Sequence, residues 1–95
     1  EDLCSSIQNY AKKAEQPPLF IAIDQEGGKV ARLKKPFTIF PGAPYIKTHK
    51  DAEKFAEITG AELKRTGINM NMAPVLDIAP NNFKNSVMKG RMFCS

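Results

Sequence analysis

The chain has 95 residues, of which 42% are apolar and 25% are charged. These fractions are typical of one small globular domain and exclude a disordered chain. The net charge is +4, but the basic residues are scattered and form no stripe, so nucleic-acid binding is not predicted. The longest uninterrupted apolar run, Leu19 to Ile23, is far too short to cross a membrane.

The cysteines and the two ends of the chain give expectations about the cellular compartment and about truncation. Cys4 and Cys94 come with no CxxC or Cys/His spacing, so we predict free thiols in a reducing compartment and no zinc site. The opening Glu1-Asp2 is unlike the basic start of a secretory signal, and we expect a cytoplasmic protein. Because there is no initiator methionine and no punctuation at the last residue, we expect a fragment truncated at both ends.

A first helix is predicted over residues 3–14, because apolar residues recur there on one helical face. They are Leu3, Ile7, Tyr10, Ala11 and Ala14. Pro17-Pro18 end this helix, since proline donates no backbone hydrogen bond. The run from Leu19 to Asp24 then predicts a strand buried on both faces, as in a parallel sheet. Gly27-Gly28 break the strand, and residues 29–40 are predicted as an irregular excursion or a short hairpin.

A second helix is predicted after a turn cluster at residues 40–44. Thr48 or Asp51 is its expected N-cap, and Gly67 suits the left-handed position at its C-terminus. Gly60 lies in the middle of this helix, where glycine is unfavourable. We therefore expect another backbone to approach closely at Gly60.

A second strand is predicted over residues 68–78, although Pro74 weakens its far half. With a helix between the two strands, the order is that of a βαβ unit, whose strands are parallel and whose crossover is right-handed. The predicted fold class is therefore α/β, with about two parallel strands and their helices.

Both predicted strands end in an aspartate, Asp24 and Asp77. In parallel α/β folds ligands bind beyond the carboxyl ends of the strands, so we expect the two carboxylates to share one functional edge. The alternative for each aspartate is that it only caps local backbone donors.

The most informative stretch runs from Asp24 to Gly28, with a carboxylate, an amide and a second carboxylate before two glycines. Such side chains bind several hydroxyl groups, and the pattern matches no nucleotide-binding motif. Arg32 either folds back over the same edge as a donor or is solvated, as most loop arginines are. His49, the single histidine, has no partner at motif spacing, and we predict a solvated surface imidazole.

Residues 19–33, which contain Asp-Gln-Glu-Gly-Gly-Lys-Val-Ala-Arg, resemble a segment of glycoside hydrolase family 3, most closely its β-N-acetylhexosaminidase branch. Further blocks follow in the family's order: Phe40-Pro-Gly-Ala43, Gly67-Ile-Asn-Met-Asn-Met-Ala-Pro-Val-Leu-Asp77 and Gly90-Arg-Met-Phe93. The resemblance spans about residues 17–93. It implies that residues 1–95 are part of the family's N-terminal catalytic domain, a (β/α)₈ TIM barrel, in its third and fourth strand region. A whole barrel takes about 250 residues.

The resemblance implies a retaining exo-glycosidase that hydrolyses terminal β-linked N-acetylglucosamine from cell-wall-derived oligosaccharides, as in bacterial peptidoglycan recycling. The family's nucleophile and acid/base lie outside this chain, so no catalytic residue is assigned and the 95 residues alone are predicted to be inactive. No metal and no organic cofactor is implied. The implied partners are the carbohydrate substrate and the remainder of the barrel, with no nucleic acid and no membrane.

The resemblance also implies a set of substrate-binding residues: Asp24, Arg32 and Arg91. Asp77 matches an aspartate that shapes the edge of the site. Met92 and Cys94 depart from the commoner serine and glycine, which puts the local loop shape in question. Two alternatives stay open: another family 3 exo-glycosidase such as a β-glucosidase, or an isolated fragment without catalytic activity. The stretch from Gln25 to Gly28 favours the hexosaminidase branch over a β-glucosidase.

Overall fold

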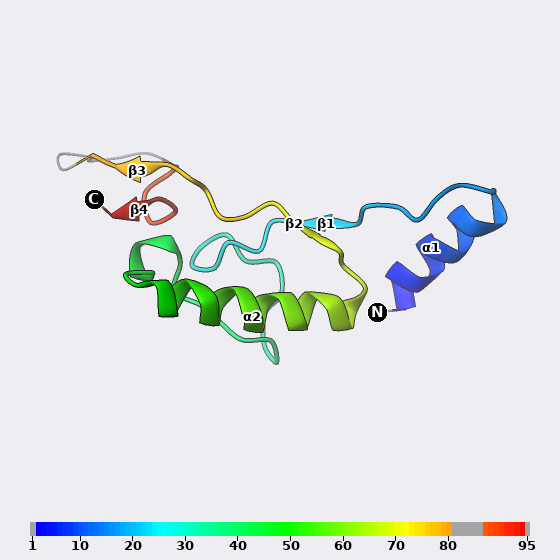
Figure 1. Cartoon of the computed structure of the whole chain (residues 1–95), viewed down its shortest axis with the longest axis horizontal. Coiled ribbons are helices and arrows are strands. Elements are labelled where there is room, and N and C mark those ends of the chain that lie inside the picture. Colours follow the sequence, from blue (N-terminus) through cyan, green and yellow to red (C-terminus); the bar gives the residue numbers. More distant parts are fainter. Residues whose placement is uncertain (1, 81–86, 95) are drawn as a thin grey trace.

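Figure 1 shows a computed structural model of the chain, in which residues 2–80 and 87–94 are described. The molecule is elongated, with principal-axis extents of 53 × 23 × 22 Å. Its elements in chain order are α1 (Asp2–Lys13), β1 (Ala22–Ile23), the 3₁₀ turn η1 (Ala43–Tyr45), α2 (His49–Thr66), β2 (Met70–Asn71), β3 (Ile78–Ala79) and β4 (Phe93–Cys94). In the described ranges, no helix combines the length and the apolar character needed to span a membrane.

The first predicted helix is confirmed as α1. It ends at Lys13, and the chain leaves it through Glu15, whose backbone is left-handed with φ 56°. The side chain of Gln8 clamps the backbone of Leu19: its Nε2 donates to the carbonyl and its Oε1 accepts from the N–H, both at 2.9 Å. These two hydrogen bonds fasten α1 to the extended segment that leads into β1.

β1 and β2 form a parallel pair, and α2 connects them along the chain. The register places Ala22 opposite Met70 and Ile23 opposite Asn71. This pairing confirms the predicted parallel strands and the α/β class. The described residues form two separate two-stranded parallel sheets, and the closed barrel stays a prediction.

Two asparagine side chains extend the pairing of β1 beyond its ends. Asn69 accepts from the N–H of Ile21 at 2.7 Å and donates to the carbonyl of Leu19 at 3.0 Å. Asn71 accepts from the N–H of Gln25 at 3.0 Å and donates to the carbonyl of the same residue at 3.1 Å. The amides thus satisfy backbone groups that such short strands leave unpaired. The second clamp fixes the direction in which the chain leaves β1.

α2 begins and ends where its sequence signals predict. The Thr48 hydroxyl accepts from the N–H of Asp51 at 3.1 Å. The Asp51 carboxylate accepts in return from the N–H groups of Thr48 and Lys47, at 3.1 and 3.0 Å, which completes a capping box. Gly67 closes the helix in the left-handed conformation, with φ 88°. A Cβ at Gly67 would lie 2.6 Å from the Cβ of Cys4, so only glycine leaves room for α1.

The expectation for Gly60 is wrong. Among the described residues, no atom lies within 4 Å of the position that a Cβ at Gly60 would take. The reason is that Gly60 borders a cavity of about 390 Å³ between α2 and the segment from Asn71 to Pro74. No backbone from residues 2–80 or 87–94 other than that of α2 approaches Gly60 here.

The prediction that the first strand is buried on both faces is also wrong. Phe20 is 80% exposed and Leu19 is 43% exposed. In the described part of the chain, β1 has one neighbouring strand, β2, and α2 runs along one side of that pair (Figure 1). Within β1 itself, Ala22 is exposed and Ile23 is half-buried, so the described residues leave this segment partly open to solvent.

The second predicted strand, residues 68–78, is wrong as a single element. The structure has two short strands, β2 and β3, with Pro74 between them, because proline has no N–H to donate to a sheet ladder. β3 pairs in parallel with β4, and Ile78 lies opposite Phe93. Asp77 consequently precedes a strand and does not end one.

Candidate functional site

The chain reverses direction directly after β1. Gly27 and Gly28 have positive φ angles of 89° and 60°, which glycine adopts without strain. The N–H groups of Glu26 and Gly27 both donate to the carbonyl of Val30, at 2.9 and 3.1 Å. The predicted break at the glycines and the irregular excursion are thus confirmed, and the reversal returns Arg32 to the neighbourhood of Asp24.

Gln25 holds this reversal together from the inside. The residue is buried, with 7% exposure. Its Oε1 accepts from the N–H groups of Arg32 and Leu33, at 2.7 and 3.0 Å, and its Nε2 donates to the carbonyl of Leu33 at 3.2 Å. The interpretation of Gln25 as a hydroxyl ligand is therefore wrong, because its amide is buried against backbone groups.

Asp24 and Arg32 form an exposed, loose ion pair. Nη2 of Arg32 lies 3.5 Å from Oδ2 of Asp24, and the two side chains are 60% and 51% exposed. Among the described residues, the Asp24 carboxylate accepts from no backbone N–H, which argues against a purely local capping role. Water screens such a pair strongly, so the ion pair contributes little free energy. Asp24 and Arg32 can therefore separate and bind a polar ligand at a small cost in free energy.

Glu26 and Arg91 form a tighter pair across 65 residues of chain. Nε of Arg91 donates to Oε2 of Glu26 at 3.0 Å, and Nη2 donates to Oε1 at 2.8 Å. The Arg91 and Glu26 side chains are 22% and 9% exposed. Two parallel charge-assisted bonds of this kind fix both distance and orientation. Sequence reasoning missed this pairing, because no local spacing relates the two residues.

The pair alters the electrostatics of Arg91. The hydrogen bonds that Arg91 donates to Glu26 raise the pKa of its guanidinium, and the negative charges of Glu26 and Asp24 raise it further against the opposing effect of burial. Asp24 lies two residues before Glu26 along the chain, and its negative charge adds a smaller contribution in the same direction. We call Asp24, Glu26, Arg32 and Arg91 the acid–arginine cluster.

Close contacts between loops bring Arg91 to this cluster. The N–H of Gly28 donates to the carbonyl of Phe40 at 2.7 Å. A Cβ at Gly28 would lie 2.9 Å from the carbonyl oxygen of Pro41, and one at Gly42 would lie 3.2 Å from that of Gly90. The turn after β1, the segment before η1 and the segment before β4 therefore meet at their glycines.

The structure does not bring every candidate residue into the cluster. Asp77 lies immediately before β3, and its carbonyl accepts from the N–H of Phe93 at 3.1 Å. Its expected position at the end of the same strand as Asn71 is wrong, because Pro74 interrupts that strand. His49 is the first residue of α2 and is exposed, as predicted for a surface imidazole.

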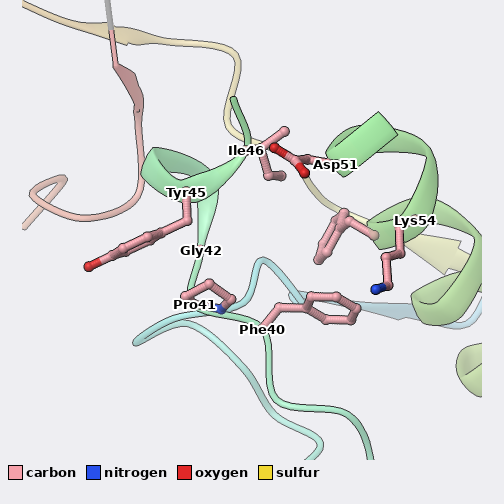
Figure 2. Close-up of a pocket in the computed structure, with 8 residues that line it drawn as sticks. Phe40, Pro41, Gly42, Tyr45, Ile46, Asp51 and Lys54 are labelled. Carbon is pink, nitrogen blue, oxygen red and sulfur yellow. The ribbon is translucent and has the colours of Figure 1, made fainter. Parts of the chain in front are cut away.

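A separate cavity of about 190 Å³ lies between η1 and the first turns of α2. Its lining includes Phe40, Lys54 and Phe55. Figure 2 shows the Tyr45 hydroxyl directed away from Asp51. The rings of Phe40 and Phe55 meet edge to face, with centroids 5.0 Å apart. None of the lining residues belongs to the acid–arginine cluster, and the Asp51 carboxylate is engaged in the helix cap.

Metal binding has no support in the described part of the chain. Within residues 2–80 and 87–94, no three His, Cys, Asp or Glu side chains gather as metal ligands would. The acid–arginine cluster places carboxylate acceptors beside guanidinium donors, and both kinds of group form hydrogen bonds with hydroxyl groups.

The family-model match over residues 1–95 places the chain among the glycoside hydrolases. The chain is a member of glycosyl hydrolase family 3, since the model of that family's N-terminal domain matches residues 1–95. The resemblance seen in the sequence motifs is confirmed.

Curated relatives share the sequence over most of this chain. Beta-hexosaminidase A of Pseudoalteromonas piscicida is 42% identical, over 96% of this chain and 16% of its own length. Beta-hexosaminidase of Pseudomonas aeruginosa (strain LESB58) is 34% identical, over 97% of this chain and 27% of its own length. The chain thus spans between 16% and 27% of the length of these two relatives. No solved structure matches it.

Proposed function

We propose that this chain contributes sugar-binding residues to a longer retaining exo-glycosidase that hydrolyses terminal β-linked N-acetylglucosamine. The observation that carries the proposal is the convergence of Asp24, Arg32 and Arg91 beyond the carboxyl end of β1. The relatives named beta-hexosaminidase support the choice of sugar. Cell-wall-derived oligosaccharides, in the cytoplasm, are the substrates we propose.

The cluster offers complementary groups for a sugar ring. The Asp24 carboxylate accepts hydrogen bonds from hydroxyl groups, and the guanidinium groups of Arg32 and Arg91 donate to hydroxyl oxygens. Because Asp24 and Arg32 are exposed and only loosely paired, a sugar hydroxyl can replace each partner without leaving an unsatisfied charge.

The chemical step requires two further groups, which we place outside these 95 residues. In retaining hydrolysis a carboxylate attacks the anomeric carbon through an oxocarbenium-like transition state. A second group protonates the leaving oxygen and then activates water. The residues of this chain hold the terminal sugar against those groups, and hydrogen bonds that shorten as the ring flattens contribute to the rate.

The test is Asp24→Asn in the full-length protein that carries this segment. The substitution keeps the shape but removes charge-assisted hydrogen bonds worth about 1.5–3 kcal/mol each. We expect kcat/KM toward a nitrophenyl β-N-acetylglucosaminide to fall by about a hundredfold, with little change in melting temperature.

Asp77→Asn is the matched control, because this carboxylate lies outside the acid–arginine cluster. We expect it to lose less activity than Asp24→Asn. Near-normal kcat/KM in Asp24→Asn, or a greater catalytic loss in Asp77→Asn at equal stability, would contradict the proposed role of Asp24. Preferential turnover of a nitrophenyl β-glucoside by the unsubstituted protein would overturn the proposed sugar.

A further inference from the structure

Arg91 and Arg32 are held very differently, although both belong to the acid–arginine cluster. Arg32 has one long contact of 3.5 Å to Asp24, and its side chain is 60% exposed. Arg91 has two hydrogen bonds of 2.8 and 3.0 Å to a Glu26 side chain that is only 9% exposed. Arg32 is therefore free to reorient, whereas the guanidinium of Arg91 is held in one plane.

The donors that Glu26 leaves unused can serve a ligand. A guanidinium carries five N–H donors in a rigid planar fork. Glu26 occupies Nε and Nη2, and within residues 2–80 and 87–94 no acceptor is seen for the two donors of Nη1, which are left for a ligand. Because the fork is rigid, fixing two of its nitrogen atoms also fixes the direction in which the Nη1 donors point.

Both ends of the pair are anchored by backbone contacts. The N–H of Glu26 donates to the carbonyl of Val30 at 2.9 Å, and the N–H of Arg91 donates to the carbonyl of Met88 at 3.0 Å. The backbones of both loops approach Gly42, where a Cβ would lie 3.2 Å from the carbonyl oxygen of Gly90 and 3.5 Å from the Cα of Gly28. Because the backbone at Glu26 is held in place, its carboxylate can fix the position of the guanidinium at the end of the long Arg91 side chain.

We propose that Glu26 is a positioning residue, which orients the guanidinium of Arg91 beside Asp24 so that its remaining donors meet a hydroxyl of the bound sugar. The inference rests on the proposed function and adds a residue to it. The arrangement selects ligands with two neighbouring hydroxyls, one that donates to Asp24 and one that accepts from Arg91.

The first measurement tests for the Glu26–Arg91 hydrogen bonds by NMR, without any substrate. In the full-length protein, the NMR signal of the Arg91 Nε–H group, assigned by its absence in Arg91→Lys, should be sharp and slow to exchange. Glu26→Gln should broaden it and speed its exchange. Glu62→Gln is the matched control, because Glu62 also holds a loop, accepting from the N–H and hydroxyl of Thr38 at 3.0 and 2.6 Å. That control should leave the Arg91 signal unchanged.

The second measurement is a double-mutant cycle in kcat/KM toward the nitrophenyl β-N-acetylglucosaminide. Glu26→Gln should lower kcat/KM by roughly tenfold or more, whereas the same change in an Arg91→Lys background should lower it by less than about threefold. Glu26→Asp retains the negative charge, so its kcat/KM should lie between that of Glu26→Gln and that of the unsubstituted protein. Melting temperatures of all variants separate these effects from unfolding, and Glu26→Asp replaces Glu26→Gln if the latter does not fold.

The outcomes separate the two proposals. Three outcomes would each overturn the positioning role. Glu26→Gln could lower kcat/KM equally in both backgrounds, it could leave the Arg91 Nε–H signal unchanged, or it could broaden that signal while kcat/KM stays normal. No turnover by the unsubstituted protein would overturn the proposed function instead. The NMR comparison would then decide by itself whether Glu26 orients Arg91.

Discussion

Gln25 and Glu26 are adjacent polar residues of one motif, yet they have different roles. The buried Gln25 amide binds the backbone of Arg32 and Leu33, whereas Glu26 binds the Arg91 side chain. Consecutive side chains of an extended segment point to opposite sides, and this alternation separates Gln25 from its two acidic neighbours. Residue type alone grouped the three together as hydroxyl ligands. In the structure Gln25 binds backbone groups and Glu26 binds Arg91, and Asp24 is the one for which the role stays a prediction.

A prediction at this scale concerns Gly28. A Cβ there would lie 2.9 Å from the carbonyl oxygen of Pro41, and φ is +60°. We expect Gly28→Ala to destabilise the full-length protein by roughly 2–3 kcal/mol, from backbone strain and this clash together. Gly90→Ala isolates the strain, since φ is +78° and no described atom lies within 4 Å of its Cβ position. Its cost should be about 1 kcal/mol. Thermal denaturation of both variants checks the difference, and equal costs would contradict it.

Among the elements, α2 is the one whose first and last residues are set most clearly by residues close to them in the sequence. Its capping box lies between Thr48 and Asp51, with a further hydrogen bond from Lys47, and Gly67 ends the helix at the other side. Such contacts form whenever the helix forms, whatever packs against it. The strands behave differently, because each strand needs a partner from a distant part of the chain.

The cap makes α2 sensitive to acid. The hydrogen bond from the N–H of Lys47, with those from Thr48, lowers the pKa of Asp51 below its ordinary value of 3.8. A lowered pKa means that the folded helix favours the ionised form, so its stabilisation is complete above pH 3.8 and is lost as the pH falls through the lower folded value. In a peptide of residues 46–68, we expect circular dichroism to show helix loss in that window. Asp51→Asn should have less helix at neutral pH and lose less on acidification.

Gly60 gives a second prediction for this helix. With open space around its Cβ position, alanine fits, and the helix interior gains about 0.5–1 kcal/mol. Gly60→Ala should therefore raise the helix content of the same peptide. In the full-length protein, a loss of stability instead would mean that a segment outside residues 2–80 and 87–94 packs against Gly60.

At the scale of the whole molecule, apolar side chains are poorly covered. Phe20, Leu76 and Ile78 are 80%, 81% and 65% exposed, although all three lie in or beside strands. The described core is small: Ala11, Ala31, Ala43, Leu63 and Met92. Exposed apolar surface of this extent needs a covering partner, and exposed strand edges pair readily with other chains.

We therefore expect the isolated 95-residue chain to be partly folded or prone to aggregate. It should also fail to hydrolyse a nitrophenyl β-N-acetylglucosaminide, because we place the nucleophile and the acid/base elsewhere. Size-exclusion chromatography and thermal scans at micromolar concentration test the first point, and an activity assay of the same sample tests the second. A monomer with a sharp cooperative transition would contradict the first, and turnover would contradict the second.

The sequence by itself determined both helices, the capping box of α2, the turn at Gly27-Gly28 and the parallel pairing of β1 with β2. The family also followed from the sequence, through motifs in the correct order. The helices, the cap and the turn depend on periodicity, on caps and on glycines, whose physics acts over a few neighbouring residues. The parallel pairing was inferred from the order strand, helix, strand. The α/β class follows from the same order.

Only the tertiary structure decided which polar residues meet. Glu26 binds Arg91 across 65 residues, and Pro74 divides the predicted strand so that Asp77 precedes β3. The open surroundings of Gly60 and Phe20 likewise depend on what lies next to them in space. The physical reason is that these features depend on segments distant in the chain. The Glu26–Arg91 pair, for example, accompanies the approach of three loops at Gly28, Gly42 and Gly90, and no residue pattern within any one of those loops specifies the positions of the other two.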